Sequence, residues 1–514
     1  MLRTAAEFRS WREACQGPIA FVPTMGGLHQ GHARLIGAAV KSCCVKGSVL
    51  VSSFVNPLQF GVDEDFDRYP RTFEDDCALA EQAGASALWC PDERQVYPYG
   101  TSEGWRLLAP ARLTAHLCGP WRSGHFDGVV TVVMRLLGLV RPHQLWLGEK
   151  DWQQLTILRH LIKDFGLPVR VRGCPTVREA DGLAASSRNR YLGDAQRTVA
   201  SAFSSALCAV ARDVRAGGVD VASAQAALHQ QLREAGLEVE YVETVDPVTL
   251  QPARPGRSIR MLAAAVRCGE TRLIDHVFIM TRSPIVAIDG PAGAGKSTVT
   301  RAFAERMGLL YLDTGAMYRA VTWWVQKNGG DPSSAPAVEA LLEGLEVDLS
   351  PLKDGVQTVR VNGRDITDAI RDPEVTGSVS LVAAHPCVRA LLTRQQQRLG
   401  ERGGLVAEGR DIGTAVFPDA DVKVFLTATP EERARRRAKD LEARGHAVPD
   451  LAELEAQIVE RDRLDSTRDV APLVQADDAT ELITDGMSIE AVIDALEDLF
   501  RFRVAEEIWP TPEG

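Results

Sequence analysis

The sequence lacks the features that mark secreted, zinc-binding and integral membrane proteins. Its ten cysteines are scattered and include neither a C-x-x-C pair nor a Cys/His array with zinc spacing. There is no run of about 18 uninterrupted apolar residues, and residues 1–16 lack the apolar core of a secretory signal. We therefore expect a cytoplasmic protein in a reducing compartment. Cys43 and Cys44, the one close pair, are interpreted as small core or surface residues rather than a disulfide or metal site.

An excess of positive charge is also absent. The chain has 58 Lys and Arg residues against 69 Asp and Glu residues, which gives a formal net charge of −11. We therefore expect neither nucleic acid nor a membrane surface as the main partner, and phosphate chemistry must depend on local basic clusters. What is present is an ordinary globular composition, 45% hydrophobic and 25% charged, over 514 residues. This length predicts about three or four folding units.

Strand-like and helix-like segments alternate along the chain. Two short apolar runs, at 18–22 and 284–289, are each followed by a glycine-containing turn and a helical pattern. Between them lie alternating expected strands and helices, at 49–54, 75–83, 87–90, 145–147, 151–164 and 169–171. The alternation predicts an α/β fold with a parallel sheet and crossover helices. A helical pattern at 196–235 is followed by short strands at 239–245 and 263–266 and by an apolar run at 272–279. Together they predict a smaller α+β subdomain after the parallel sheet.

Two histidines open the helix that follows the first turn. The stretch HQGH, residues 29–32, comes directly after Gly26 and Gly27, and residues three apart on a helix face the same side. A helix N-terminus attracts phosphate through its dipole and N–H groups. Imidazoles there can donate to an α-phosphate under attack. On this motif alone, two histidines without such a role remain the alternative.

Two further stretches suit a triphosphate. GEKD, residues 148–151, follows an expected strand, where α/β sheets place ligand-binding loops, and Lys150 supplies a point charge. Ser186, Ser187 and Arg188 form a loop that carries hydroxyl and guanidinium groups. The layout resembles that of nucleotidyltransferases related to class I aminoacyl-tRNA synthetases.

Six ordered stretches carry a closer resemblance over residues 18–280. They are PTMGGLHQGH (23–32), FVNPLQFG (54–61), YPRT (69–72), SGHFDGVVTVV (123–133), LGEKDWQQL (147–155) and TVREADGLAASSRNRYL (176–192). Together they resemble pantothenate synthetase, the pantoate–β-alanine ligase family. The resemblance implies that pantoate attacks the α-phosphate of ATP to form a pantoyl-adenylate. The amine of β-alanine then attacks the adenylate, giving pantothenate, AMP and pyrophosphate.

The resemblance also implies the roles of individual residues. His29 and His32 would stabilise the pentavalent α-phosphate, and Lys150 and Arg188 would hold the leaving phosphates. The implied ATP-binding set is Met25, Gly26, Gly27, Leu28, His29, Gln30, Gly31, His32, Gly148, Glu149, Lys150, Asp151, Val177, Ala185, Ser186, Ser187 and Arg188. Trp152 and Ala185 stand where the family often has Tyr and Met, and we expect little effect from either difference.

Substrate and metal ligands of this site are implied in the same way. Gln59 and Gln154 would hydrogen-bond pantoate. Further substrate-side residues are Asn56, Arg122 and His125. Asp75 and Asp76 are candidates to hold Mg²⁺. The alternative, that they are helix N-terminal carboxylates favoured only by the dipole, stays open.

A second phosphate-binding motif is GPAGAGKS, residues 290–297, which fits G-x-x-x-x-G-K-[ST]. An apolar strand precedes it and a helical pattern at 297–307 follows, as the motif requires. Its N–H groups cradle phosphates, Lys296 reaches the β- and γ-phosphates, and Ser297 can ligate Mg²⁺. The motif alone does not separate a kinase from a GTPase or an ATPase motor.

Three later stretches favour a small-molecule kinase. LDTGAMYR (312–319) places an acid, a hydroxyl and an arginine behind the P-loop helix, and EGRD (408–411) follows an expected strand. The arginines of a predicted helix at 431–437 have the composition of a mobile lid over ATP; they are Arg433, Arg435, Arg436 and Arg437. Phosphoryl transfer between two anions needs several cations to offset their repulsion. A solvated basic helix is the alternative for this cluster.

Residues 284–500 resemble cytidylate kinase, which transfers the γ-phosphate of ATP to CMP or dCMP. The matching stretches are IDGPAGAGKST (288–298), LDTGAMYRA (312–320), EGRDIGTAVFPDA (408–420) and RDRLDSTRDVAPL (461–473). The resemblance implies an ATP-binding set of Gly290, Pro291, Ala292, Gly293, Ala294, Gly295, Lys296, Ser297, Thr298, Arg433 and Arg436. It implies a CMP-binding set of Arg319, Ser380, Arg389, Arg410, Asp411, Arg461, Asp465 and Arg468, while Asp313 would orient the acceptor phosphate or Mg²⁺.

The expected organisation is therefore two enzymes on one chain. Domain 1–280 is expected to hold a Rossmann-like nucleotidyltransferase part, about 1–190, and a smaller subdomain, 191–280. Domain 281–514 is expected to be a P-loop nucleoside-monophosphate kinase, with a nucleotide-binding insert at about 335–400 and a lid at about 430–470. Asn362-Gly363 is a type I′ hairpin signal within the insert, and the stretch after Val504 is expected to be frayed.

The expected cofactors and partners are ATP, Mg²⁺, pantoate, β-alanine and CMP or dCMP. The first domain resembles a family that forms dimers, which implies at least a homodimer. One alternative is a monofunctional pantothenate synthetase whose kinase half has become a nucleotide-sensing module. Another is that either half acts on a different substrate. The intact Lys296 and Ser297 favour two working enzymes.

Overall fold

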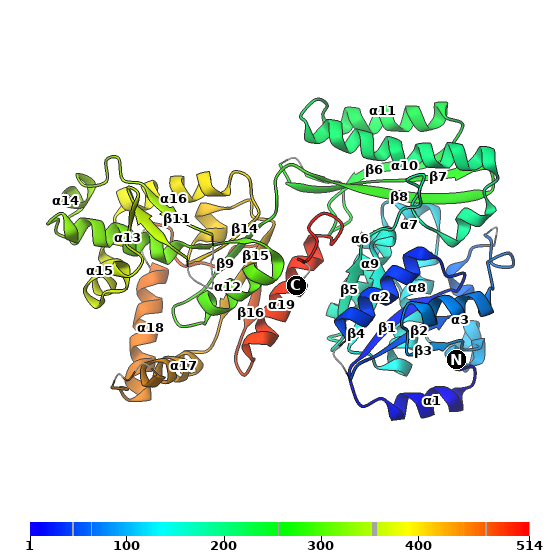
Figure 1. The fold of residues 1–514 in the computed structure, drawn as a ribbon, viewed down its shortest axis with the longest axis horizontal. Coiled ribbons are helices and arrows are strands. Elements are labelled where there is room, and N and C mark those ends of the chain that lie inside the picture. The colour runs from blue at the N-terminus through cyan, green and yellow to red at the C-terminus, as the bar shows by residue number, and fades with distance from the viewer. Residues whose placement is uncertain are drawn as a thin grey trace. The chain divides into compact units, whose positions relative to one another are not determined.

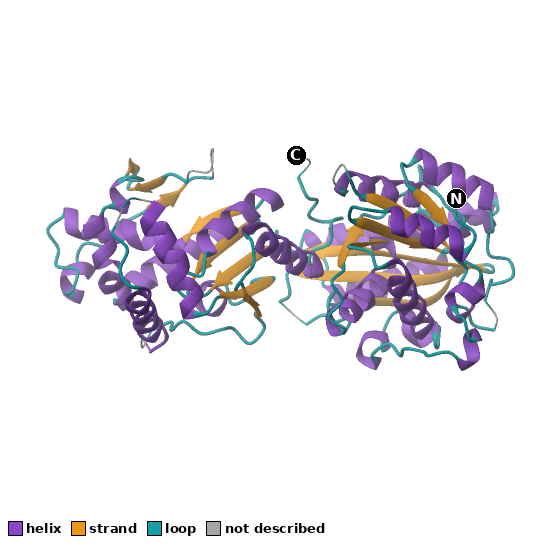
Figure 2. Ribbon diagram, turned by 90° about the horizontal axis from the view of Figure 1, so that it is seen from below, coloured by secondary structure: helices purple, strands orange, loops and turns teal. Residues whose placement is uncertain are grey.

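The computed structural model describes residues 1–43, 46–62, 64–254, 256–351, 357–443, 445, 447–467 and 470–512. The chain divides into two compact units (Figure 1). Unit 1 comprises Met1–Thr281 and Arg501–Pro510, and unit 2 comprises Arg282–Phe500 and Thr511–Gly514. In both units helices pack against parallel strands (Figure 2), which confirms the predicted α/β class.

Unit 1 is built on a five-stranded parallel sheet with the order β3-β2-β1-β4-β5. Its strands are β1 (Ile19–Thr24), β2 (Ser48–Ser53), β3 (Ala87–Trp89), β4 (Gln144–Gly148) and β5 (Arg170–Cys174). The central strand β1 begins with an uninterrupted buried apolar run, as a strand covered on both faces requires. The strand order reverses direction between β1 and β4. In such sheets ligands bind outside the carboxyl ends of the strands at this point.

The connections of this sheet are mostly helical. The helices are α1 (Ala5–Ala14), α2 (Gln30–Ser42), α3 (Phe73–Gln82), α4 (Glu93–Val96), α5 (Gly100–Glu103), α6 (Ala111–Thr114), α7 (Cys118–Trp121), α8 (His125–Val140) and α9 (Trp152–Asp164), with the short 3-10 turns η1 (Pro57–Gln59), η2 (Glu149–Asp151) and η3 (Ser187–Tyr191). The turn from β1 to α2 requires glycine at Gly26, because φ is +85° there and a Cβ atom would lie 2.7 Å from Ser53 Oγ.

The rest of unit 1 before residue 281 is an antiparallel sheet covered by two helices. The strands are β6 (Glu238–Val245), β7 (Ile259–Cys268) and β8 (Thr271–Met280), and the helices are α10 (Asp194–Arg215) and α11 (Val221–Glu234). Both helices lie along one face of the sheet in Figure 1 and share an apolar core with it. This is the predicted α+β element.

Unit 2 contains a second parallel sheet, with the order β10-β14-β9-β15-β16. Its strands are β9 (Ile285–Asp289), β10 (Leu310–Asp313), β14 (Leu405–Gly409), β15 (Val422–Thr427) and β16 (Thr480–Ile483). The P-loop follows the central strand β9. Glycine is required at Gly290, where a Cβ atom would lie 2.0 Å from the Leu426 carbonyl oxygen.

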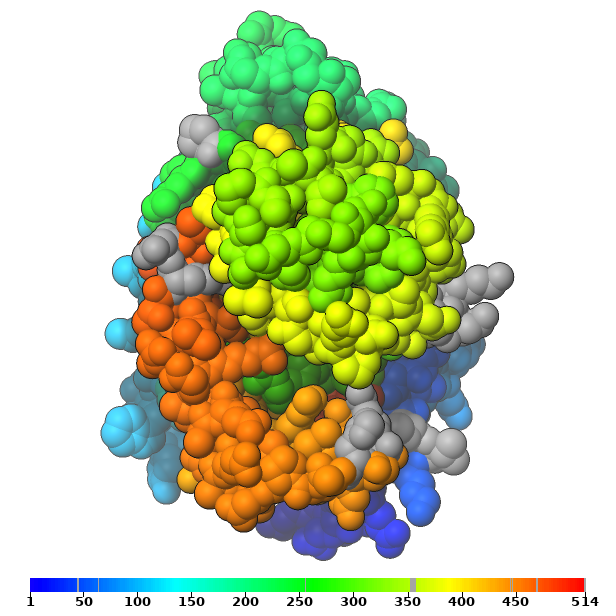
Figure 3. Space-filling view, turned by 90° about the vertical axis from the view of Figure 1, so that its left-hand side faces the viewer, coloured from blue at the N-terminus to red at the C-terminus, as the bar shows by residue number. Residues whose placement is uncertain are grey.

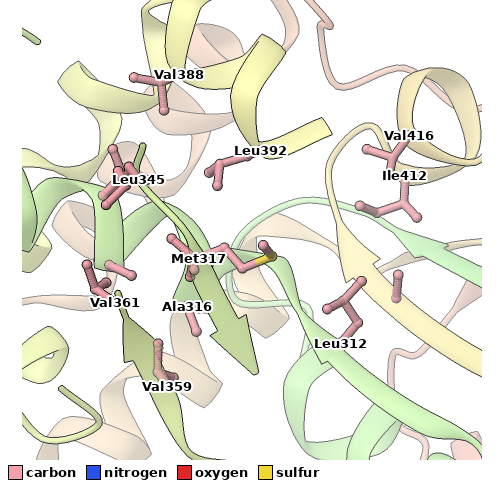
Figure 4. Packing of buried hydrophobic residues seen from close by; sticks show 14 of the residues in the cluster. Leu312, Ala316, Met317, Leu345, Val359, Val361, Val388, Leu392, Ile412 and Val416 are labelled. Atoms are coloured by element: carbon pink, nitrogen blue, oxygen red, sulfur yellow. The ribbon is translucent and has the colours of Figure 1, made fainter. Parts of the chain in front are cut away.

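Helices of unit 2 surround this sheet and extend beyond it. They are α12 (Lys296–Met307), α13 (Thr314–Lys327), α14 (Ala335–Glu339), α15 (Pro373–Ala384), α16 (Pro386–Gly400), α17 (Pro430–Ala443), α18 (Leu451–Thr467) and α19 (Ile489–Arg503), with the short turns η4 (Ala369–Arg371) and η5 (Ile412–Val416). Leu312, Met317, Leu392 and Ile412 belong to one core cluster, so the insert helices and the sheet share an interior (Figure 4).

A small antiparallel sheet lies within the insert. It consists of β11 (Val347–Leu349), β12 (Val359–Val361) and β13 (Arg364–Asp365). Asn362 and Gly363 join β12 to β13 with φ of 48° and 78°, which confirms the predicted type I′ hairpin.

The expectation of a frayed stretch after Val504 is wrong. Val504 and Ala505 are both 0% exposed, and residues 501–510 belong to unit 1. Composition suggested disorder because the stretch is rich in Glu and Pro. In the structure, the backbone N–H groups of Glu506 and Glu507 instead donate to Glu149, a buried side chain of unit 1.

No single helix among the described residues has the length and hydropathy of a membrane span; α15 and α16 together are long and apolar enough, but they are bent by 95°. No disulfide joins any of the nine described cysteines, Cys43 is half-buried, and Cys44 lies outside the described residues.

Leu392→Ala should destabilise unit 2. The side chain is 0% exposed in the core of Figure 4, so truncation leaves a cavity that costs about 2–5 kcal/mol. The measurement is calorimetric unfolding of the full chain, in which one transition should move to lower temperature. Leu381→Ala is the control, because Leu381 is 53% exposed. Equal shifts in the two variants would contradict the packing described here.

Candidate active sites

A cavity of about 680 Å³ opens in unit 1 at the carboxyl ends of β1 and β4. The predicted residues that line it are Met25, His29, Gly31, His32, Gln59, Arg122, Gly148, Lys150, Asp151, Gln154, Val177, Ala185, Ser186, Ser187 and Arg188. Segments far apart in the sequence thus meet at the switch point of the sheet. The predicted residues outside the lining are Gly26, Gly27, Leu28, Gln30, Glu149, Asn56, His125, Asp75 and Asp76.

The backbone selects the tautomer of both cavity histidines. His29 caps α2, and its Nδ1 accepts a hydrogen bond from the Gly31 N–H at 3.1 Å. His32 Nδ1 accepts from the His29 N–H at 3.3 Å, and the two ring centroids are 4.2 Å apart. Because Nδ1 is the acceptor in each ring, the proton of the neutral imidazole resides on Nε2. The pair therefore offers two N–H donors.

Both rings are kept neutral by their surroundings. Burial, aided by the charges of Lys150 and Arg190, lowers the pKa of His29 to about 4. Burial and the neighbouring His29 lower the pKa of His32 to about 3. Near neutral pH the pair can donate hydrogen bonds to an anion but adds no positive charge of its own. The fixed positive charge beside the pair comes from Arg190 and from Lys150, whose Nζ lies 3.8 Å from Asp151 Oδ1.

Asp76 holds the glycine turn that precedes the histidines. It is 1% exposed, and its Oδ2 accepts from the Gly27 N–H at 3.0 Å while its Oδ1 accepts from the Leu28 N–H at 2.7 Å. Thr72 Oγ1 adds a third bond, at 3.1 Å. Asp75, the other predicted Mg²⁺ ligand, is exposed. The carboxylate of Asp76 is thus committed to backbone donors, which does not suit a metal ligand.

A second hydrogen-bonded group surrounds Gln59. Its backbone carbonyl oxygen lies 2.8 Å from His125 Nδ1 and accepts from Arg122 Nη2 at 3.2 Å. Asn56, which is 0% exposed, donates to Gln59 Oε1 at 3.1 Å. Burial and Arg122 lower the pKa of His125 to about 3. Asn56 and His125 therefore orient Gln59, which lines the cavity.

Three cavity residues were missed in the sequence. Asp65 holds Arg188 through two hydrogen bonds, at 2.7 and 2.9 Å, and Glu64 pairs with Arg122 at 2.5 Å. Tyr69 shares a hydrogen bond with Ser187 Oγ at 3.1 Å. Tyr69 belongs to the YPRT stretch and was within reach of sequence reasoning. Glu64 and Asp65 belong to none of the quoted stretches, so no motif identified them as site residues.

Unit 2 contains a larger cavity, of about 1380 Å³. In Figure 3 it lies between the yellow-green segment and the orange segment that contains α17 and α18, with dark-green residues at its floor. The predicted residues that line it are Ala292, Gly293, Ala294, Gly295, Lys296, Ser297, Thr298, Asp313, Arg319, Ser380, Arg389, Arg410, Asp411, Arg436, Arg461 and Asp465. Gly290 and Pro291 precede this lining, and Arg468 lies outside the described residues.

The P-loop lysine is held by its own loop. Lys296 Nζ donates to the carbonyl oxygens of Gly290 and Pro291, at 2.7 and 2.8 Å. Burial lowers the pKa of Lys296, and the charge of Arg410 acts in the same direction. Burial raises the pKa of Glu408, which hydrogen-bonds Ser297 and accepts from Tyr311 OH at 2.7 Å. Glu408 and Tyr311 were not predicted as site residues, although Glu408 belongs to the quoted EGRD stretch.

Arginines of α17 close over the P-loop. Arg433 donates to the Ala292 carbonyl at 3.1 Å and pairs with Asp462 at 2.6 Å. Arg436 donates to the Ala294 carbonyl at 3.2 Å. These contacts distinguish the two arginines from Arg435 and Arg437, which are more than half exposed.

Three of the predicted CMP-binding arginines are paired with a carboxylate. Arg389 pairs with Asp411, and both side chains are buried. Arg410 pairs with Asp465 at 2.9 Å, and Arg319 pairs with Asp313 at 3.2 Å. Ser380 and Arg461 line the same cavity. The predicted CMP-binding residues among the described part of the chain are thus brought together.

The two folds and sites define a chain that carries an adenylate-forming ligase and a P-loop nucleoside-monophosphate kinase. Two family models match it, one described as pantoate-beta-alanine ligase over residues 1–278 and one described as cytidylate kinase over residues 286–501. A pantothenate synthetase crystal structure from Thermus thermophilus is 41% identical, with a TM-score of 0.51, and the match covers 55% of this chain and 100% of that one.

Full-length relatives carry both names. A "Bifunctional pantoate ligase/cytidylate kinase" from Synechococcus sp. (strain WH7803) is 95% identical over 490 residues, which cover 95% of this chain and 100% of that protein. One from Parasynechococcus marenigrum (strain WH8102) is 63% identical over 514 residues and covers 100% of both chains. The chain belongs to the bifunctional pantoate ligase/cytidylate kinase family. It is an enzyme with both activities, ATP-dependent ligation of pantoate to β-alanine and phosphorylation of CMP or dCMP by ATP.

Both cavity histidines should stay neutral throughout the physiological range. NMR titration of the ring Cε1–H signals, assigned with His29→Gln and His32→Gln, should give pKa values of about 4 and about 3. In the urea-unfolded chain both rings should titrate near the ordinary value of about 6.5. Because the folded values are the lower ones, folding stability should fall as the pH drops from about 6.5 toward the folded values. A folded ring that titrates near 6.5 would contradict this environment.

Asp76→Asn and Asp75→Asn should separate a structural role from a metal role. The amide introduced by Asp76→Asn keeps one acceptor oxygen, so Gly27 or Leu28 loses its partner, and pantothenate formation should fall about tenfold or more. Asp75→Asn should leave the rate within about twofold, because an exposed side chain with no such bonds is replaced. Steady-state assays at several Mg²⁺ concentrations are the measurement. Equal losses that added Mg²⁺ restores would instead support the metal role.

Proposed function

We propose that ATP and pantoate meet in the cavity of unit 1, with the α-phosphate beside His29 and His32. The observation that carries this placement is the pair of Nε2–H donors, fixed by backbone hydrogen bonds at 3.1 and 3.3 Å. A pantoate carboxylate oxygen forms a bond to the α-phosphorus, and the bond from that phosphorus to pyrophosphate breaks. The two donors stabilise the oxygen atoms on which negative charge grows. Lys150 and Arg188 would hold the departing pyrophosphate.

The second step uses the same cavity. The amine of β-alanine attacks the carbonyl carbon of pantoyl-adenylate, the carbon–oxygen bond to AMP breaks, and the amine loses a proton. Gln59 and Gln154 would hold the pantoyl hydroxyls, because a neutral amide can both donate and accept. Arg188 is paired with Asp65 and must exchange that carboxylate for phosphate. Tyr69 and Ser187 lie at the same wall of the cavity.

We infer that both kinase substrates bind in the cavity of unit 2. ATP binds along the P-loop, and CMP binds beside the insert residues that line the same cavity. Lys296 would leave its loop carbonyls for the β- and γ-phosphates, and Arg433 and Arg436 already contact the same loop. The exocyclic amine of cytosine suits the Asp411 acceptor, with Arg389 and Ser380 alongside. Arg319 and Arg410 would bind the acceptor phosphate, and Arg461 and Asp465 the sugar.

Mg²⁺ fits the kinase site better than the ligase carboxylates. Ser297 follows the P-loop lysine, and its hydroxyl is next to the Glu408 carboxyl group. Ser297 would hold the ion, which would neutralise phosphate charge there. Asp76 does not fit, because both its oxygens accept backbone N–H groups. No step in unit 1 is assigned to a metal held by that residue.

We further propose that unit 1 forms a homodimer and that the protein works in the cytoplasm. Unit 1 exposes several large apolar side chains, including Trp105 at 92% and Tyr99 at 78%. A second copy of the chain would cover such surface. The described cysteines, none of which forms a disulfide, suit a reducing compartment.

Lys296→Ala and His32→Ala should separate the two activities. Phosphorus NMR of the full chain with Mg-ATP would follow AMP and pyrophosphate with pantoate and β-alanine, and ADP and CDP with CMP. Lys296→Ala should abolish CDP formation and leave pantothenate formation unchanged, because Lys296 lies in unit 2. His32→Ala should slow pantothenate formation about a hundredfold or more, the usual cost of losing one transition-state donor, and spare CDP formation. Loss of both activities in one folded variant would contradict independent sites.

A further inference from the structure

Residues 501–510 form part of unit 1, although both family models leave most of them out. The models end at residues 278 and 501. The segment belongs to the same compact unit as the ligase cavity. Its backbone N–H groups at Glu506 and Glu507 donate to the two carboxylate oxygens of Glu149, at 2.8 and 2.9 Å. Glu149 directly precedes Lys150.

Glu149 has few ways to relax. It is 0% exposed, and it follows β4 in the short turn η2 that also contains Lys150 and Asp151. The carboxylate is packed against β5, where a Cβ atom on Gly173 would lie 2.7 Å from Glu149 Oε1. A buried carboxylate without hydrogen-bond donors is costly. The two N–H groups of the segment therefore hold this side chain in place.

The segment itself has a defined conformation. The Ala505 carbonyl accepts from the N–H groups of Ile508 and Trp509, at 3.3 and 3.1 Å, which makes a tight turn. Arg501 donates to the Trp509 carbonyl at 2.6 Å and pairs with Glu506 at 3.0 Å. Phe502 packs edge-on against His160 of α9, with ring centroids 5.0 Å apart. The turn thus presents two successive N–H groups to Glu149.

We propose that residues 501–510 are a positioning element of the ligase site. By holding Glu149, the segment orients η2 and so places the Lys150 ammonium where pyrophosphate departs. This inference rests on the role proposed above for Lys150. Glu506 and Glu507 act through their backbone, and neither residue is part of the cavity lining.

A proline substitution tests the backbone donor directly. Glu506 occupies the second position of the turn that Ala505 and Ile508 close, a position that accepts proline. Glu506→Pro removes the N–H donor, whereas Glu506→Ala keeps it. Both variants lose the ion pair with Arg501, so the pair differs in the donor and not in the side-chain charge.

The experiment uses the full chain and measures pantoate-dependent exchange between ATP and pyrophosphate, which reports adenylate formation alone. Glu506→Pro should lower kcat of this exchange about tenfold relative to Glu506→Ala, the scale of one lost bond to a charged group. The KM for pantoate should be unchanged, since Gln59 and Gln154 are not moved. CMP phosphorylation should be equal in both variants.

Two results would overturn the proposal. Equal exchange rates in the proline and alanine variants would show that the donor does not affect the site. A lower unfolding temperature in Glu506→Pro, with kcat unchanged at 25 °C, would show a purely structural role. Lys150→Ala, measured in parallel, separates the premise from the inference. If Lys150→Ala leaves the exchange unchanged, the role proposed for Lys150 fails first.

Discussion

Buried carboxylates that each accept two backbone N–H groups hold the loops of both active sites. Asp76 accepts from Gly27 and Leu28 at the turn before the ligase histidines. Asp289, at the end of β9, accepts from Ile412 and Gly413 at 2.8 and 2.7 Å, next to Asp411. Burial raises the pKa of Asp289 to about 6. Each of these carboxylates fixes a loop that directly follows a strand, and the placement of the side chains that this loop carries into the cavity depends on it.

Several cations of the two cavities are held by nearby carboxylates and do not come from an overall excess of positive charge. The chain is acidic overall, yet several arginines that line the cavities are paired with carboxylates, as in Arg188 with Asp65 and Arg410 with Asp465. Before a substrate binds, the carboxylate offsets the free-energy cost of holding the arginine charge away from water. An anionic substrate that binds such an arginine takes the place of the carboxylate. The cavities can therefore collect several cations without a basic surface.

Local patterns predicted the parts of the fold that depend on local chemistry. The strand, glycine turn and helix around Gly26 and around Gly290 follow from residue periodicity and φ requirements, and the Asn362-Gly363 hairpin follows from turn chemistry. The carboxylates Asp65 and Glu64 were not predicted, because their partners are distant in sequence and no spacing rule relates them. That residues 501–510 belong to unit 1 could not be predicted either, because composition describes a segment but not the surface against which it packs.

Unit 1 takes residues from two parts of the chain separated by all of residues 282–500. On a ribosome, which delivers the chain from its N-terminus, the first 281 residues emerge well before the segment that supplies the partners of Glu149. Domains generally fold as they emerge. Until the kinase sequence has been made, the ligase unit lacks the two N–H groups that donate to Glu149. Completion of the first enzyme is in this way tied to synthesis of the second, and a ribosome that stops within residues 282–500 leaves both incomplete.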